Sequence, residues 1–125
     1  AMRAAKNNDW IVEGIAEYYS VEILHRAGAI SRIRKREILL DLDAWSSNIN
    51  SLVSDRSTGK RTAKAAVLFH RLDQEIDTLT GGRSSLDVIA KGLVQQKRVD
   101  LDGLKRLFFQ AFGQESDSLK KVKGG

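Results

Sequence analysis

Proline is absent from this sequence of 125 residues. Because proline breaks helix interiors and is common in loops and turns, its absence favours a mostly helical chain. Cysteine is absent too, which excludes disulfides, thiolate zinc sites and cysteine nucleophiles. The length and the 42% of hydrophobic residues suit one domain with a substantial core. We therefore predict a single all-α domain over residues 1–125, in which Ala1, before Met2, is interpreted as a cloning scar.

The spacing of apolar residues and the residues that cap helix ends predict about five helices in one bundle. They cover about 9–27, 31–53, 61–80, a shorter stretch opened by a capping box of Ser84 and Asp87, and 101–112. Glycines at 28, 81 and 113 are expected to end three of them, because glycine readily adopts the left-handed conformation that follows many helices. The polar segment 54–60 is predicted to be a loop and the tail 114–125 to be frayed.

The net charge of +5 and the pI near 9.7 permit contact with nucleic acid or an anionic membrane but require neither. No stretch approaches the roughly 20 apolar residues of a membrane span, and no secretion signal stands at the start. The sequence has no glycine-rich phosphate loop, no RNA-stacking motif and no obvious recognition helix. Composition leaves the compartment open, and neither sequence-specific nucleic-acid binding nor membrane binding is expected.

The first predicted helix is apolar around well over half of its circumference. At about 100° per residue, Glu13, Glu17 and Ser20 share a narrow polar stripe, and apolar side chains occupy most of the rest. A helix of this kind needs neighbours on several sides. Taken alone, Glu13 is explained by a favourable interaction with the helix dipole, and His25 by capping of the opposite end.

Three segments resemble the gluzincin zinc aminopeptidases, the glycyl aminopeptidase branch in particular. Residues 10–19, WIVEGIAEYY, resemble the W-x-x-E-G-x-A/T-x-Y-Y segment of that family. Residues 63–73, AKAAVLFHRLD, are similar to its Y-x-K-G-A-x-x-x-x-x-L-D helix, and residues 80–87, TGGRSSLD, to its T-G-G-x-x-S-L-D turn. The three segments stand in the order of the family and lie between residues 10 and 87, a range that takes in most of the chain.

The resemblance implies that Glu13 occupies the position of the third protein ligand of a catalytic zinc. In the family the other two ligands are the histidines of an H-E-x-x-H helix, whose glutamate is the general base. This sequence contains no H-E-x-x-H, and Thr62 aligns with the tyrosine that hydrogen-bonds the tetrahedral intermediate in the family. We therefore expect Glu13 to be a vestigial ligand position, no cofactor in this chain and no peptidase activity.

The resemblance also implies a neighbour for the first helix. If the chain corresponds to the later part of a peptidase domain, the face that would meet an N-terminal half is expected to be exposed and apolar. The candidates are Ile11, Val12, Ile15 and Tyr18, which lie away from the polar stripe. Exposed apolar patches usually become interfaces, so we expect self-association there, or binding of an N-terminal peptidase half.

A run of basic residues is the strongest binding signal outside the resemblance. Arg32, Arg34, Lys35 and Arg36 lie in the first turns of their helix, where the dipole disfavours cations. Arg32 and Arg36 also form a like-charge pair at i, i+4. A nearby anion, either an acidic side chain or a phosphate, would relieve this repulsion.

Two interpretations follow from the sequence. The first is a non-catalytic fragment or truncated relative of a zinc metallo-aminopeptidase. The second is a small basic helical module that binds nucleic acid or an acidic protein. The second would use the side chains of Arg32, Arg34, Lys35, Arg36, Lys60, Arg61 and Lys64.

Overall fold

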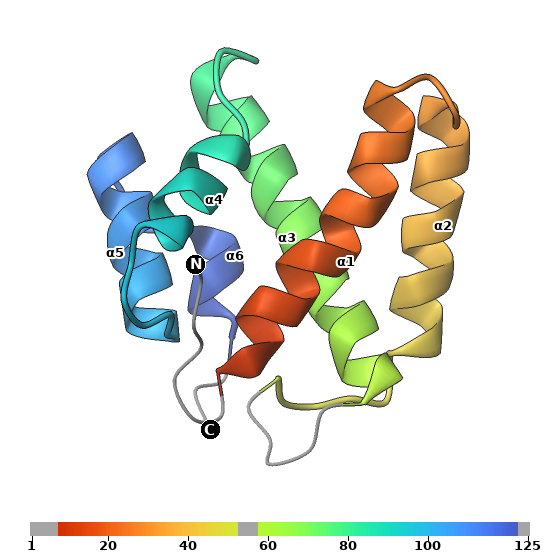
Figure 1. Ribbon diagram of the computed structural model, residues 1–125, viewed down its shortest axis with the longest axis horizontal. Coiled ribbons are helices and arrows are strands. Elements are labelled where there is room, and N and C mark those ends of the chain that lie inside the picture. The colour runs from red at the N-terminus through yellow and green to blue at the C-terminus, as the bar shows by residue number, and fades with distance from the viewer. Residues whose placement is uncertain (1–7, 53–57, 123–125) are drawn as a thin grey trace.

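The computed structural model describes residues 8–52 and 58–122, and this part of the chain is all-α (Figure 1). Its helices are, in order, α1 (Asp9–Arg26), α2 (Arg32–Trp45), α3 (Gly59–Thr80), α4 (Asp87–Val94), α5 (Leu101–Phe112) and α6 (Asp117–Lys120). α3 runs through the middle, with α1 and α2 on one side of it and α4, α5 and α6 on the other (Figure 1). Buried apolar side chains from all six helices form one cluster. The expected all-α helical bundle is confirmed.

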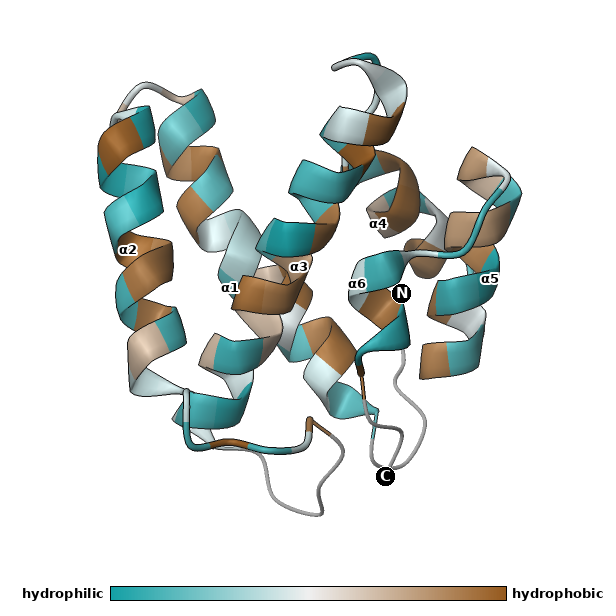
Figure 2. Ribbon diagram, turned by 180° about the vertical axis from the view of Figure 1, so that it is seen from behind, coloured by the Kyte–Doolittle hydropathy of each residue, from teal (hydrophilic) through white to brown (hydrophobic). Residues whose placement is uncertain are grey.

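The contact between α1 and α3 is the largest between two helices in the described part. α1 buries Trp10, Ile11, Ile15 and Tyr18, and the rings of Trp10 and Phe69 stack with their centroids 6.2 Å apart. Seen from behind, α4 carries a continuous hydrophobic stretch, whereas hydrophobic and hydrophilic residues alternate along α2 (Figure 2). α2 accordingly buries only Leu39.

The face of α1 that was expected to be exposed is covered by the chain itself. Ile11, Ile15 and Tyr18 are 0%, 6% and 0% exposed, and Val12 is half-buried. The expectation of an exposed apolar face at Ile11, Ile15 and Tyr18 is therefore wrong. Because more than half of the helix circumference is apolar, the sequence pattern did not determine which stripe would face α3.

Most helix ends agree with their local capping signals. α3 and α5 end at Gly81 and Gly113, which adopt φ values of 60° and 74° in the left-handed region. α2 is shorter than expected, since it ends at Trp45, and the Ser46 hydroxyl donates to the carbonyl of Leu42 at 2.7 Å. Serine and asparagine side chains compete for backbone hydrogen bonds, which favours ending a helix in the segment 46–50.

Two predictions near the C-terminal half were wrong. α4 begins at Asp87 without the capping box of Ser84 and Asp87, and the backbone N–H of Leu86 donates instead to the Asp73 carboxylate of α3 (2.9 Å). The tail contains α6 and buries Leu119, so residues 114–122 are not frayed. Both differences come from carboxylates of α3, which local sequence patterns do not include. Ala1, Met2 and residues 53–57 and 123–125 lie outside the described residues.

Candidate functional site

Glu13 and Thr62 lie together where α1 meets the first turn of α3. The Thr62 hydroxyl donates to the Glu13 carboxylate at 3.0 Å, although the two residues are 49 positions apart. A third group joins them, since Nη2 of Arg61 lies 3.7 Å from Oε2 of Glu13. The structure thus brings Glu13 and Thr62, which the sequence resemblance singled out separately, into direct contact.

Arg61 is the most buried charged side chain of this cluster, with 2% of its side chain exposed. Its Nη2 donates to Asp9 at 3.0 Å, so its charge is neutralised by two carboxylates from the first turns of α1. A buried guanidinium cannot contact a nucleic-acid backbone at the surface. Arg61 is therefore wrongly included in the predicted basic binding surface, whereas its neighbours Lys60 and Lys64 are half-buried.

The histidines lie apart from Glu13. His25 Nδ1 is 3.3 Å from the carbonyl of Ile30, just beyond the end of α1. His70 lies on α3, with its ring centroid 6.0 Å from that of Tyr18, and burial lowers its pKa. Within residues 8–52 and 58–122, no group of three or more His, Cys, Asp or Glu side chains is arranged to hold a metal ion.

The paired tyrosines of α1 bind the two aspartates of the other resembling segments. Tyr18 donates to Asp73 at 2.5 Å, and Tyr19 donates to Asp87 at 2.6 Å. Burial and these hydrogen bonds raise the pKa of both phenols, which remain protonated donors. Arg26 adds a two-pronged contact to Asp87, at 2.9 and 3.0 Å, and this hydrogen bonding lowers the pKa of that carboxyl. The network joins α1, α3 and α4.

Gly14 marks the closest approach of α1 and α3. A Cβ added at Gly14 would lie 2.5 Å from the Cβ of Ala65 and 3.1 Å from Cε2 of Phe69. Only glycine permits this helix crossing as it stands. Gly14 directly follows Glu13 in the first resembling segment, and Ala65 directly follows Lys64 in the second, so the crossing lies within the resembling sequence.

The basic run of α2 divides into three roles. Lys35 is largely buried and binds Glu22 of α1 at 2.8 Å and the Tyr18 hydroxyl at 3.2 Å, so an acidic side chain does relieve part of the repulsion. Burial alone would raise the pKa of Glu22, but the hydrogen bonds from Lys35 and Arg26 outweigh it and lower the pKa. Arg34 points elsewhere and forms an exposed pair with Glu37 at 3.8 Å. Arg32 and Arg36 are exposed beside a cleft.

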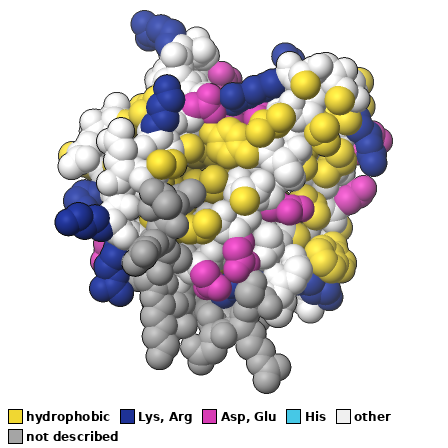
Figure 3. Space-filling model, in the orientation of Figure 1, with side chains coloured by type: hydrophobic (Ala, Val, Ile, Leu, Met, Phe, Trp, Pro, Cys, Tyr) yellow, Lys and Arg dark blue, Asp and Glu magenta, His cyan; other side chains and the backbone are white. Residues whose placement is uncertain are grey.

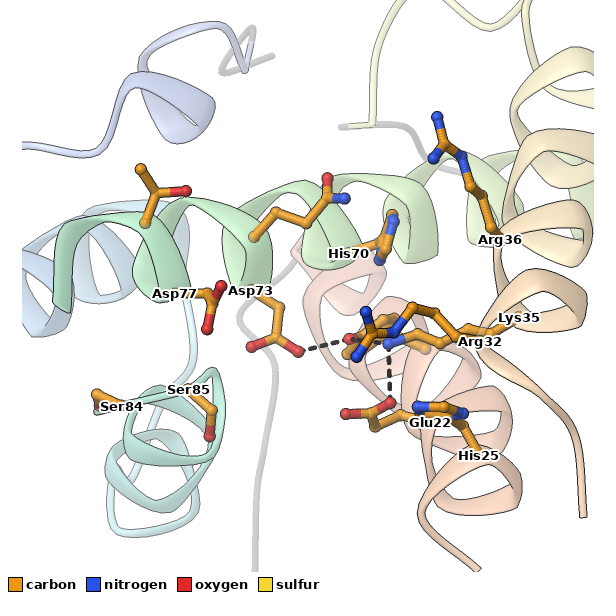
Figure 4. A pocket seen from close by; sticks show the side chains of 13 residues that line it. Glu22, His25, Arg32, Lys35, Arg36, His70, Asp73, Asp77, Ser84 and Ser85 are labelled. Carbon is orange, nitrogen blue, oxygen red and sulfur yellow. Dashed lines mark hydrogen bonds and ion pairs between the residues drawn. The ribbon is translucent and has the colours of Figure 1, made fainter. Parts of the chain in front are cut away.

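This cleft has a volume of about 540 Å³ and lies between α1, α2, α3 and the segment before α4. Arg32, Lys35 and Arg36 reach it from α2, and Asp73 and Asp77 reach it from α3 (Figure 4). The Glu22–Lys35 pair and the Tyr18–Asp73 hydrogen bond lie within it (Figure 4). Three of the four predicted anion-binding residues therefore line one cavity, together with carboxylates.

The sequence prediction did not single out Glu22 or Asp77. Glu22 had a usable signal, because it lies four residues before Arg26 and four after Tyr18 on one side of α1. The sequence contained no comparable signal for Asp77, since an acidic residue on the solvent side of a surface helix is ordinary.

The outward side of α1 carries a second apolar stripe. Val12, Ala16, Tyr19 and Ile23 recur at intervals of three or four residues, and Ile23 is 59% exposed. Figure 3 shows hydrophobic side chains gathered near the centre of this face, with basic and acidic side chains around them. Of the four residues expected to form an interface, only Val12 belongs to this outward stripe.

No protein-family model, curated protein or solved structure matches this chain. In the part of the chain that the structure describes, no helix combines the length and apolar character that crossing a bilayer requires.

Proposed function

We propose that this chain is a non-catalytic relative of the zinc metallo-aminopeptidases, corresponding to the later helical part of their catalytic domain. The observation that carries the proposal is the hydrogen bond from Thr62 to Glu13 at 3.0 Å. The resemblance assigns both residues to one catalytic centre, as the tyrosine position and the zinc-ligand position. A coincidental sequence match would give no reason for them to meet across 49 positions.

Contacts among the other resembling residues support the same proposal. Tyr18 binds Asp73 and Tyr19 binds Asp87, so the first segment is hydrogen-bonded to both the second and the third. Gly14 packs against Ala65 at the crossing of α1 and α3. Residues that the motifs list separately thus act as one set of contacts, which is what a shared fold would require.

The chemistry around Glu13 supports a non-catalytic role. Arg61, a cation, lies 3.7 Å from the carboxylate, at a site where the family resemblance implies a metal. One carboxylate is a poor zinc site, because catalytic zinc needs three protein ligands. A threonine hydroxyl is also shorter and far less acidic than a phenol, so it is poorly suited to stabilise an oxyanion in the place of tyrosine.

The test is hydrolysis of small aminoacyl reporter substrates by chelator-treated and zinc-reloaded protein. We expect the same background rate with and without zinc, and no stoichiometric zinc binding in calorimetry. Glu17→Ala is the matched control for Glu13→Ala, since both residues are glutamates of α1 and Glu17 is exposed. Zinc-dependent turnover that Glu13→Ala abolishes and Glu17→Ala leaves intact would refute the proposal.

A second candidate is a basic module that binds nucleic acid or an acidic protein. The observation in its favour is that Arg32 and Arg36, one turn apart on α2, are both exposed and line the cleft. An affinity for labelled DNA or RNA that falls steeply with salt would support it, because counterions are released when cations neutralise phosphates. We expect little binding at about 150 mM salt, since the sequence offers no motif that recognises bases.

A further inference from the structure

The cleft between α1, α2 and α3 holds charges of both signs, and those in its interior are already paired. Lys35 is neutralised by Glu22 at 2.8 Å. Asp73 accepts hydrogen bonds from the Tyr18 hydroxyl at 2.5 Å and from the backbone N–H of Leu86 at 2.9 Å. The charged groups of Lys35, Glu22 and Asp73 are thus paired or hydrogen-bonded within the protein.

The charges at the rim differ from those in the interior. Arg32 and Arg36 project from successive turns of α2, and Asp77 projects from α3 toward Ser84 and Ser85 (Figure 4). Among residues 8–52 and 58–122, no acidic side chain pairs with Arg32 or Arg36 and no basic side chain pairs with Asp77. The cleft therefore has two cations on its α2 side, and a carboxylate with neighbouring hydroxyls on the side formed by α3 and the segment before α4.

We propose that this cleft binds a small zwitterionic ligand, with its carboxylate at Arg32 and Arg36 and its ammonium group at Asp77. The planar guanidinium group is suited to carboxylates, because it donates two parallel hydrogen bonds. The Asp77 carboxylate and the hydroxyls of Ser84 and Ser85 are acceptors for an ammonium group. A cavity of about 540 Å³ lies within the size range of small-molecule sites.

The spacing along α3 indicates the length of the ligand. Arg36, His70 and Gln74 line both this cleft and an adjoining cavity of about 250 Å³, and His70 is the residue of this set on α3 that lies furthest from Asp77, so it sets the upper limit of the distance between the two ends. Asp77 lies seven residues further along α3, which corresponds to about 10 Å at 1.5 Å per residue. Three residues of extended peptide span about the same distance. A zwitterion of up to the length of a tripeptide therefore fits between the two ends.

The same charges argue against a polyanion in this cleft. A nucleic-acid backbone carries several phosphates. If it were bound at Arg32 and Arg36, it would also bring phosphates toward the carboxylates of Asp73 and Asp77, which repel them. Glu13 and Thr62 do not line the cleft. The inference is thus independent of the proposed relation to zinc peptidases, and the outcome of the zinc experiments does not affect it.

The experiment is an NMR titration of the full chain with triglycine, following backbone amide shifts. We expect saturable shifts in α2 and α3 around the cleft, with a dissociation constant of about 1 mM, because both ends of the site are open to solvent. N-acetyl-triglycine lacks the ammonium group and triglycinamide lacks the carboxylate. Each should bind about tenfold more weakly, since each loses one charge-assisted contact.

Variants of the protein separate the two ends of the site. Arg32→Gln with Arg36→Gln should abolish the advantage of triglycine over triglycinamide, and Asp77→Asn should abolish its advantage over the N-acetyl form. Arg34→Gln is the matched control, because Arg34 lies on the same helix, pairs with Glu37 and does not line the cleft. All changed residues are exposed, and unchanged thermal unfolding verifies that each variant is folded.

Three results would overturn the proposal. One is the absence of saturable shifts up to about 20 mM triglycine, far above the expected dissociation constant. Another is equal binding of all three peptides, which would mean that the charges are not recognised. The last is a loss of binding in Arg34→Gln as large as that in the cleft variants, which would indicate a nonspecific effect of net charge.

Discussion

Replacing Gly14 by alanine tests the packing that joins the resembling segments. The new Cβ would lie 2.5 Å from the Cβ of Ala65 and 3.2 Å from its carbonyl carbon. Carbon atoms in ordinary contact are about 3.5–4.0 Å apart, so α1 and α3 would have to separate by about 1 Å or more. The added methyl group cannot be accommodated by a shift of Ala65 alone, because a ring atom of Phe69 lies 3.1 Å from the same position.

Two opposing effects set the size of the expected change. Adding a methyl group to a well-packed core usually costs about 1–3 kcal/mol. Alanine in a helix interior is more favourable than glycine by about 1 kcal/mol, which offsets part of that cost. We expect Gly14→Ala to lower the free energy of unfolding by about 1–2 kcal/mol and Tm by about 4–8 °C for a chain of this length.

Urea and thermal unfolding of four proteins measure the effect: the parent, Gly14→Ala, Ala65→Gly and the double variant. Removing the Ala65 methyl group makes room for the new one, so the double variant should be more stable than the sum of the single changes by about 1 kcal/mol. Ala16→Gly, on the exposed side of α1, gives the helix-propensity difference alone. If Gly14→Ala stabilised the protein by that difference, the close crossing of α1 and α3 would be refuted.

Two further predictions concern pH and association. The pKa values of Glu22, Glu75 and Asp87 are lowered in the folded protein. The stability that these carboxylates contribute is therefore present above their pKa in the unfolded chain, and it is lost as pH falls through their pKa in the folded protein. Unfolding free energy measured in urea should therefore fall below about pH 4.5, and Asp87→Asn should flatten this dependence. We also expect weak self-association through the outward stripe of α1, because Ile23 is largely exposed there. Light scattering over a concentration series should detect it, and Ile23→Glu should abolish it. A strictly monomeric parent protein would contradict this expectation.

The parts of the fold that sequence could predict are those fixed by local chemistry. α3 and α5 end at glycines in the left-handed conformation, and their apolar stripes have the period of a helix. α6 could not be predicted in this way. Its first backbone N–H groups are accepted by Glu75, 42 positions earlier on α3, and a segment of four residues has no amphipathic pattern of its own.

The residues of the candidate sites could likewise be predicted in part, whereas their contacts between helices could not. The resemblance singled out Glu13 and Thr62 separately, and the structure brings them together. The cleft was only partly foreseeable, because the basic run on α2 was visible in the sequence but Asp77 comes from another helix. Which cation of a run is buried or paired depends on the facing helix, as the Lys35–Glu22 contact illustrates. Sequence spacing places residues on one helix and leaves their partners undetermined.

Arg61 offers a direct comparison of the two functional interpretations. In a basic binding module it would contact a ligand, whereas here its guanidinium is buried between Asp9 and Glu13. Arg61→Met would leave both carboxylates without this cation. Removing one partner of a fully buried ion pair costs about 3–5 kcal/mol, and since Asp9 and Glu13 are 47% and 33% exposed we expect about 2 kcal/mol.

The double variant Arg61→Met with Glu13→Gln should recover part of this loss, because an uncharged amide no longer needs the cation. Lys60→Gln, one position earlier, removes the same charge from a more accessible residue and should change stability little. Nucleic-acid binding measured on the same variants completes the comparison. If Arg61→Met weakened binding without lowering stability, Arg61 would be a ligand contact. A loss of stability with partial recovery in the double variant would instead mean that the arginine serves the fold, as the counter-charge of the Asp9 and Glu13 carboxylates.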